Sequence, residues 1–219
     1  MVEDFPTDAE IMAEAAIEGL AQLGDVLAAE GLRAAAACGS QRIPRTALAA
    51  LIHRKAPYAV ERSLQAIRDG SYGRRAFEGL KGSRDPRAAE AVLAVLNDCR
   101  AVLSDSPPGS RERLRDRLPR HDVGEVLPHA AAALGSMKCR QAIGPLILVL
   151  AQGPAEEEAV EALMQIDPRW RTSAEGRAAL ADLRAIAADD KQSNSDRFRA
   201  ATFARLMGDT TVAMPPRAW

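Results

Sequence analysis

The segment ALGSMKCRQAIGPLILVL, residues 133–150, decides the fold class of this 219-residue chain. Just before and within it, Ala130, Ala131 and Leu134 are spaced so that they share one face of a helix. After a polar stretch, Ile147 and Leu150 mark the apolar stripe of a second helix. The segment therefore predicts two helices joined by a short turn, that is, a helical hairpin.

The same pattern recurs along the chain, and the leucine at position 134 serves as an anchor for aligning the copies. The anchors are 31, 29, 54 and 29 residues apart, and a weaker sixth copy is anchored at an alanine. They are Leu20, Leu51, Leu80, Leu134, Leu163 and Ala204. A hairpin that recurs about every 30 residues cannot bury its apolar face alone and predicts a stack of hairpins.

Two apolar columns support this register. Four residues before the anchor, every copy has alanine, which fits narrow gaps between packed helices: Ala16, Ala47, Ala76, Ala130, Ala159 and Ala200. Three residues before the anchor, the chain has Ile17, Leu48, Phe77, Ala131, Val160 and Ala201. We expect both columns to be buried between neighbouring hairpins.

Helix boundaries follow from capping residues and helix breakers. Thr7 with Glu10, Thr172 with Glu175 and Ser193 with Asp196 resemble capping boxes. Pro44 and Pro154 suit first-turn positions. The anchor-ending helices are expected near 8–22, 44–54, 72–82, 123–136, 155–166 and 195–207, and their partner helices near 26–38, 57–69, 86–103, 139–152 and 173–189.

Three of the copies resemble the HEAT-like repeats first described in phycobilisome lyases. The segments LGDVLAAEGL (23–32), SRDPRAAEAVLAVL (83–96) and ALGSMKCRQAIGPLILVL (133–150) are similar to that family's LG-x-x-D-P-x-A-x-x-x-L core. The chain departs from it at Arg54–Lys55 and Lys138–Cys139, where the family has a Gly–Asp turn. The resemblance covers residues 8 to 208 and implies an all-α fold, a right-handed α-solenoid of five to six HEAT-like helical hairpins, usually with a protein-binding role. We expect one solenoid domain over 1–208 with an insertion at 104–124, followed by a C-terminal tail at 209–219.

Composition agrees with a helical, cytoplasmic protein. The chain has 44 alanines and only 8 aromatic residues, which disfavours β-sandwiches and barrels. Its three cysteines are far apart in sequence, so neither a disulfide framework nor a zinc site is expected. The N-terminus is acidic, and the longest apolar stretch is about half of what spans a bilayer. Only four of the 29 basic residues are lysine, as GC-rich bacterial coding would produce.

Charge is segregated along the chain although its formal net charge is −1. Residues 1–30 carry −8, residues 31–121 carry +9 (18 basic against 9 acidic side chains), and residues 122–219 carry −2. In the assumed register the middle copies would present a basic stripe on the concave side, and the insertion would add further arginines. The predicted partner-binding residues are Arg45, Arg54, Lys55, Arg74, Arg75, Lys81, Arg111, Arg113, Arg115 and Arg117. The alternative interpretation is a set of solvated helix faces without a ligand.

No motif for phosphate binding, metal hydrolysis or a nucleophilic serine occurs, and no cofactor, metal or catalytic residue is expected. His53, His121 and His129 have no cysteine or carboxylate at ligand spacing. The sequence therefore favours a non-enzymatic scaffold for a protein partner, with an acidic partner suggested by the basic stripe. The alternatives are a nucleic-acid-binding protein with the architecture of HEAT-like DNA glycosylases, and a bilin-lyase-like chaperone. The oligomeric state stays open.

Overall fold

The computed structural model of the chain describes residues 12–13, 15–17, 19–20, 26–37, 47, 50–51, 57–70, 73–104, 123–153 and 155–215. Within these residues the secondary structure is helical, and no strand occurs. The expected all-α class is therefore confirmed. None of the described helices is both long and apolar enough to cross a membrane.

The observed helices overlap the expected ranges, but the helix expected at 72–82 is shorter, and the one expected at 139–152 begins only at Ile143. The anchor-ending helices are α5 (Arg74–Glu78), α8 (Val123–Ser136), α10 (Glu156–Ile166) and α12 (Asn194–Leu206). The partner helices are α2 (Val26–Ala36), α4 (Pro57–Arg68), α6 (Pro86–Ser104), α9 (Ile143–Gln152) and α11 (Ala174–Ala188). Short 3₁₀ turns, η1 (Arg140–Ala142) and η2 (Trp170–Thr172), precede α9 and α11. Both α4 and α6 begin at a proline, a residue whose fixed φ suits the first helical position.

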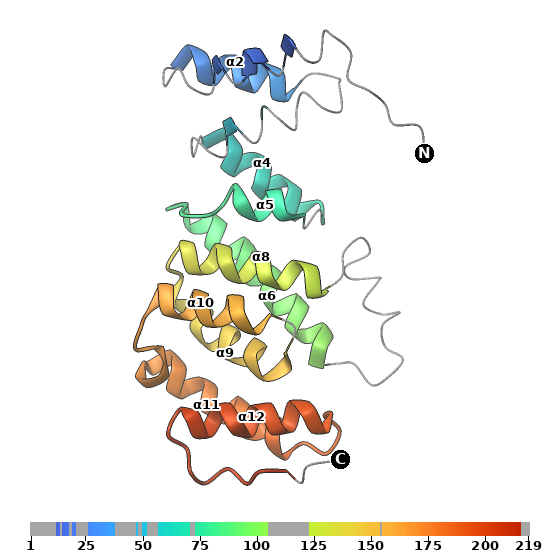
Figure 1. Cartoon of the computed structure of the whole chain (residues 1–219), viewed down its shortest axis with the longest axis vertical. Helices are drawn as coiled ribbons and strands as arrows, with labels where there is room; N and C mark the ends of the chain where they lie inside the picture. The colour runs from blue at the N-terminus through green and yellow to red at the C-terminus, as the bar shows by residue number, and fades with distance from the viewer. Residues whose placement is uncertain are drawn as a thin grey trace.

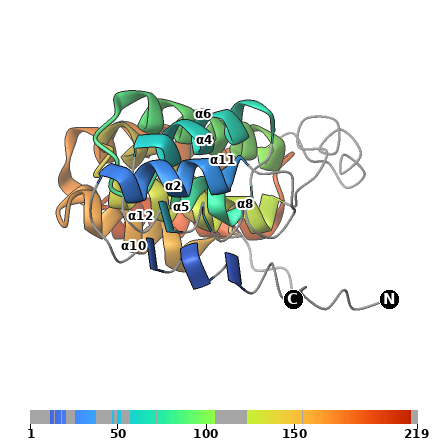
Figure 2. The ribbon, with the colours of Figure 1, turned by 90° about the horizontal axis from the view of Figure 1, so that it is seen from above.

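The helices are arranged in successive layers along the long axis, with α2 towards one end and α11 and α12 towards the other (Figure 1). Each anchor-ending helix of the middle region packs on the next, so that α5 lies against α8 and α8 against α10. Seen from above, α4, α6 and α11 lie on one side of the molecule and α5, α8, α10 and α12 on the other (Figure 2). In this view three of the partner helices are thus separated from the four anchor-ending helices.

The core is divided into two clusters. A small N-terminal cluster contains Ile17, Leu32, Leu51 and Ala59 among its buried residues. The second cluster runs without interruption from Leu64 to Val212. Helix α4 contributes to both clusters, because Ala59 belongs to the first and Leu64, one turn later, to the second.

The alanine column is a packing feature in five of the six copies. The buried members are Ala47, Ala76, Ala130, Ala159 and Ala200, each no more than 7% exposed. Ala16 is exposed, contrary to the prediction.

Helices α8 and α10 approach each other closely at Gly135. A Cβ atom at this position would lie 2.7 Å from Ala162 Cα and 2.9 Å from Ala162 Cβ, well inside ordinary van der Waals contact. Only a glycine allows the two backbones to come this close. The anchor leucine Leu134 and its neighbour therefore serve different purposes, since the leucine fills the core and the glycine sets the helix separation.

The turn after α8 uses a lysine where the first and last copies have glycine, Gly24 and Gly208. Lys138 has φ of 54°, in the left-handed region. Gly208 lies at the equivalent place after α12, with φ of 95°, and the backbone hydrogen bonds of the two turns match: the N–H groups of Cys139 and Asp209 donate to Leu134 and Ala204. The departure from the family's Gly–Asp turn thus keeps the backbone geometry of glycine at an energetic cost.

Two of the predicted capping boxes fall on described residues. The Ser193 hydroxyl accepts a hydrogen bond from the Asp196 N–H (3.1 Å) and donates to its carboxylate (2.7 Å), so this cap of α12 is confirmed. The prediction of Thr172 was wrong by one residue: Ser173 caps α11 by accepting from the N–H of Gly176 (2.9 Å). Thr172 instead closes η2 by donating to the carbonyl of Arg169.

Residues 209–215 fold back onto the last hairpin. Asp209 is buried and accepts hydrogen bonds from Arg184 Nε of α11 (2.5 Å) and from the N–H and hydroxyl of Thr211. Arg205 Nε donates to the carbonyl of Val212, whose side chain is also buried.

Several predicted features lie outside the described part of the chain. They are the Thr7 cap, Pro44, Pro154, residues 105–122 of the insertion and the last four residues.

Candidate functional site

Three of the predicted basic residues are described, and all three are exposed. Arg74 and Arg75 form the first turn of α5, and Lys81 lies in the turn that follows this helix. The Arg74 side chain is 73% exposed and pairs with Glu78 one helical turn later, at 2.5 Å. Arg75 and Lys81 form no ion pair with another residue that the structure describes. The exposed Arg84, which the sequence analysis did not include, lies in the same turn as Lys81.

We call Arg74, Arg75, Lys81 and Arg84 the basic surface. The remaining predicted basic residues lie outside the described part of the chain, and the structure does not place them beside this surface. They are Arg45, Arg54, Lys55, Arg111, Arg113, Arg115 and Arg117.

A second surface of opposite charge lies on α10. Glu156, Val160 and Met164 are four residues apart and form one exposed row on this helix, and Glu157 and Glu161 form the row beside it. We call these five residues the α10 face. None of its glutamates forms an ion pair with another described residue, whereas Glu161 accepts a hydrogen bond from Gln165 (3.0 Å).

Val160 was predicted to be buried, and this prediction is wrong: it is 36% exposed. Its counterparts Phe77, Ala131 and Ala201 are fully buried. The reason is the packing of the next anchor-ending helix. Helix α12 packs on α11 and α9, while α10 packs on α8 and α9, so α10 and α12 make few contacts with each other.

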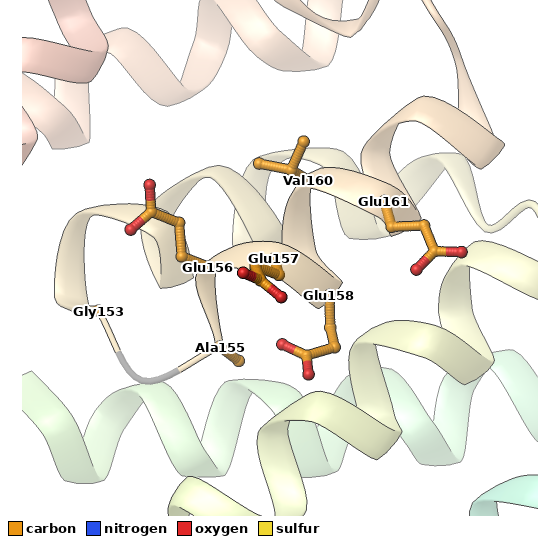
Figure 3. A pocket seen from close by; sticks show the side chains of 7 residues that line it. All are labelled: Gly153, Ala155, Glu156, Glu157, Glu158, Val160 and Glu161. Carbon is orange, nitrogen blue, oxygen red and sulfur yellow. The ribbon is translucent and has the colours of Figure 1, made fainter.

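The first two turns of α10 border an open depression of about 730 Å³. Gly153, Ala155, Glu158 and most of the α10 face line it. Figure 3 shows the four carboxylates spread along the start of the helix, with the Val160 side chain among them. At the edge of the depression, the guanidinium of Arg199 from α12 lies directly against Gly153 and would collide with a Cβ atom there.

Other charged contacts join neighbouring turns and account for several pKa shifts. Arg140 lies between Asp167 (3.6 Å) and Glu175 (3.4 Å), which belong to the following hairpin. Backbone hydrogen bonding at the start of α11 lowers the pKa of Glu175, and Arg140 lowers it further. The hydrogen bond from Arg184, assisted by Thr211, lowers the pKa of Asp209 to about 2. Arg140 thus joins two neighbouring hairpins, and Arg184 joins α11 to the segment after α12.

The side chains of Cys99 and His129 take part in the packing of the helices. Cys99 lies within α6 and is fully buried, and burial raises the pKa of its thiol to about 12. A thiol with such a pKa is a poor nucleophile at neutral pH. His129 of α8 packs on Phe77 with ring centroids 6.5 Å apart. In the described part of the chain, no three His, Cys, Asp or Glu side chains come together as a metal site would require.

In comparisons with known proteins, no family model matches the chain, and no curated protein gives a significant match. The sequence did contain a signal for the α10 face, namely an apolar pair, Val160 and Met164, at helical spacing between glutamates. That signal was outweighed because Val160 also fits the apolar column of the repeat.

Proposed function

We propose that the chain is a cytoplasmic, bacterial-type scaffold without catalytic activity, built as a right-handed HEAT-like α-solenoid that binds a protein partner. The order of helices supports the proposed architecture, since α5, α8 and α10 pack in succession on one side with partner helices on the other. Such stacks offer long surfaces composed of many equivalent helix positions. The resemblance to HEAT-like repeats remains the basis for the handedness and for the repeat family.

The observation that carries the proposed function is the basic surface at α5. Its four cations lie within eleven residues, on and just after a helix of five residues, and three of them have no carboxylate partner among the described residues. Several neighbouring guanidinium and ammonium groups create a positive potential that attracts an acidic partner. Arginine also binds carboxylates with two parallel hydrogen bonds, which adds specificity. We therefore propose an acidic protein surface as the ligand.

Nucleic acid is the second candidate, because its phosphates would also be attracted by these cations. Proteins that bind single strands or flipped bases use exposed aromatic rings for stacking. Phe77, the aromatic residue within α5, is fully buried against His129 and offers no such ring face. The basic surface thus favours a protein partner. A bilin-lyase-like chaperone role rests on the family resemblance alone.

The test is a charge reversal with a matched control. The variant replaces Arg75, Lys81 and Arg84 by glutamate, and the control makes the same change of −6 at Arg169, Arg177 and Lys191. All six side chains are exposed. Tagged wild type and both variants are used to capture partners from cells of the source organism, at low and raised salt, and captured proteins are identified by mass spectrometry.

We expect an acidic protein to be captured by the wild type and by the control, and lost by more than tenfold in the variant. Capture by the wild type should weaken as salt rises, because exposed charges are screened. Equal capture by all three proteins would contradict the proposal. Binding of single- or double-stranded DNA by the wild type at physiological salt, lost in the variant, would favour the nucleic-acid alternative.

A further inference from the structure

We infer that the α10 face is a second docking surface, and that it takes a basic amphipathic helix of a partner protein. This surface is separate from the basic surface at α5 and has the opposite charge. The inference rests on an apolar packing position without a neighbour, on the carboxylates around it and on the depression beside it.

The first step concerns Val160. In the copies on either side of α10, the residue three positions before the anchor is covered by a neighbouring helix: Ala131 and Ala201 are both fully buried. On α10 the equivalent Val160 is exposed because α12 packs elsewhere. The stack therefore leaves one helix-packing position open. Helix α8 already covers one side of α10. A partner helix placed at Val160 would cover the side that α8 leaves exposed.

The second step concerns Met164, one turn after Val160. It is 48% exposed, and together the two side chains form an apolar strip along the helix. Exposed apolar side chains at i and i+4 are the contacts that an amphipathic helix makes when it lies in a groove. Methionine adapts its shape to varied partners and is common at such surfaces.

The third step concerns charge. Glutamates in the first turn of a helix are stabilised by the helix dipole, which is sufficient reason for Glu156, Glu157 and Glu158. The dipole gives no reason for Glu161, which lies beyond the first turn and directly beside Val160. Carboxylates without ion-pair partners at one end of an apolar strip and along its side are complementary to a partner helix that carries lysine or arginine beside an apolar strip. Arg199, packed on Gly153 at the rim, forms no ion pair with these glutamates.

The experiment selects peptide ligands from a library, without assuming their charge or sequence. A phage library of helical peptides is panned on the wild type and depleted on the Val160→Lys/Met164→Lys double variant. Peptides that depend on the α10 face should carry net positive charge and apolar residues at helical spacing. Enrichment of acidic peptides, of peptides without an apolar strip, or of no peptide at all would overturn the inference.

Affinities of one selected peptide then separate the apolar and charged contributions. The Val160→Lys/Met164→Lys variant should bind at least about tenfold more weakly, a loss typical of apolar contacts at the centre of an interface. Glu157→Gln/Glu161→Gln should bind about three- to tenfold more weakly, with less dependence on salt. The controls are Leu206→Lys, an exposed apolar residue elsewhere, and Glu90→Gln on α6. Both should bind within about twofold of wild type, which also shows that changes of this kind leave the fold intact.

Two outcomes would reject the inference after a successful selection. Unchanged affinity in the Val160→Lys/Met164→Lys variant would show that the peptide binds elsewhere. Self-association of the wild type in sedimentation velocity, abolished by the same variant, would identify a second copy of the chain as the occupant in place of a basic partner helix. Because the variants used here leave α5 unchanged, failure of this inference does not affect the test of the basic surface.

Discussion

Gly135→Ala should destabilise the protein, although alanine is the better helix former. The new methyl carbon would lie 2.7 Å from Ala162 Cα, about 0.8 Å inside the optimal separation of two carbon atoms. The obstacle is backbone, so α8 and α10 must move apart and loosen the contacts of the alanine column. Overpacking of this kind costs about 1–3 kcal/mol of stability, and the higher helix propensity of alanine offsets at most about 1 kcal/mol of that loss. We expect a net loss of about 1–2 kcal/mol, or about 2–8 °C in Tm for a chain of this size.

The matched control is Gly144→Ala, the same substitution in the next helix. A Cβ atom at Gly144 would have the carbonyl oxygen of Glu175 at 4.0 Å as its nearest neighbour, an ordinary contact. This variant should gain about 0.5 kcal/mol from lower chain entropy in the unfolded state. Urea unfolding followed by circular dichroism at the helical band measures both changes. If Gly135→Ala proved as stable as Gly144→Ala, the close approach of α8 and α10 would be refuted.

Three further predictions concern single residues. Lys138→Gly should raise stability by about 0.5–1 kcal/mol in the same urea assay, since relief of the left-handed strain exceeds the added entropy of glycine, and a loss would contradict that geometry. Asp209 has a lowered pKa, so its carboxylate stabilises the fold above its unfolded pKa near 4 and ceases to do so as pH falls towards 2. Asp209→Asn should therefore lower the Tm at pH 7, with a gap to wild type that closes between pH 4 and pH 2. A constant gap would exclude the ion pair with Arg184 as the cause. With the other two cysteines changed to serine, Cys99 should react with a thiol reagent at pH 8 only on unfolding, and rapid labelling of the folded protein would show that it is accessible.

The positions of the helices could be predicted from sequence because local signals agree with one another. Apolar residues at helical spacing, breakers between them and a recurring anchor place α8 and α10 within one residue of their observed ends. The start of α9 was predicted four residues too early, because the 3₁₀ turn η1 precedes the helix. The Ser193 cap was also predictable from local signals. The cap of α11 was not, because Thr172 and Ser173 are adjacent capping residues, and Thr172 belongs to the 3₁₀ turn η2 that precedes the helix.

The candidate surfaces were predictable only in part, because exposure depends on where a neighbouring helix packs. The sequence placed Arg74 and Arg75 on the outside correctly, since their positions precede the buried face of the helix. Val160 was predicted to be buried because it is apolar and occupies a column of apolar residues. The sequence pattern does not show that α12 packs on α9 and α11 and leaves this side of α10 uncovered. The pairing of Arg74 with Glu78 could have been anticipated from their i,i+4 spacing.

The central claim is that two oppositely charged surfaces of one helical stack bind protein partners, and site-specific photo-cross-linking in the source organism tests it most directly. A photoreactive phenylalanine analogue is placed at Arg75, at Val160 and, as a reference, at the exposed Arg177 of α11. We predict adducts with an acidic protein from position 75 and with a basic helix of a partner from position 160, each identified by mass spectrometry, and none from position 177. Absence of adducts at both test positions, or the same adducts at all three, would contradict the account.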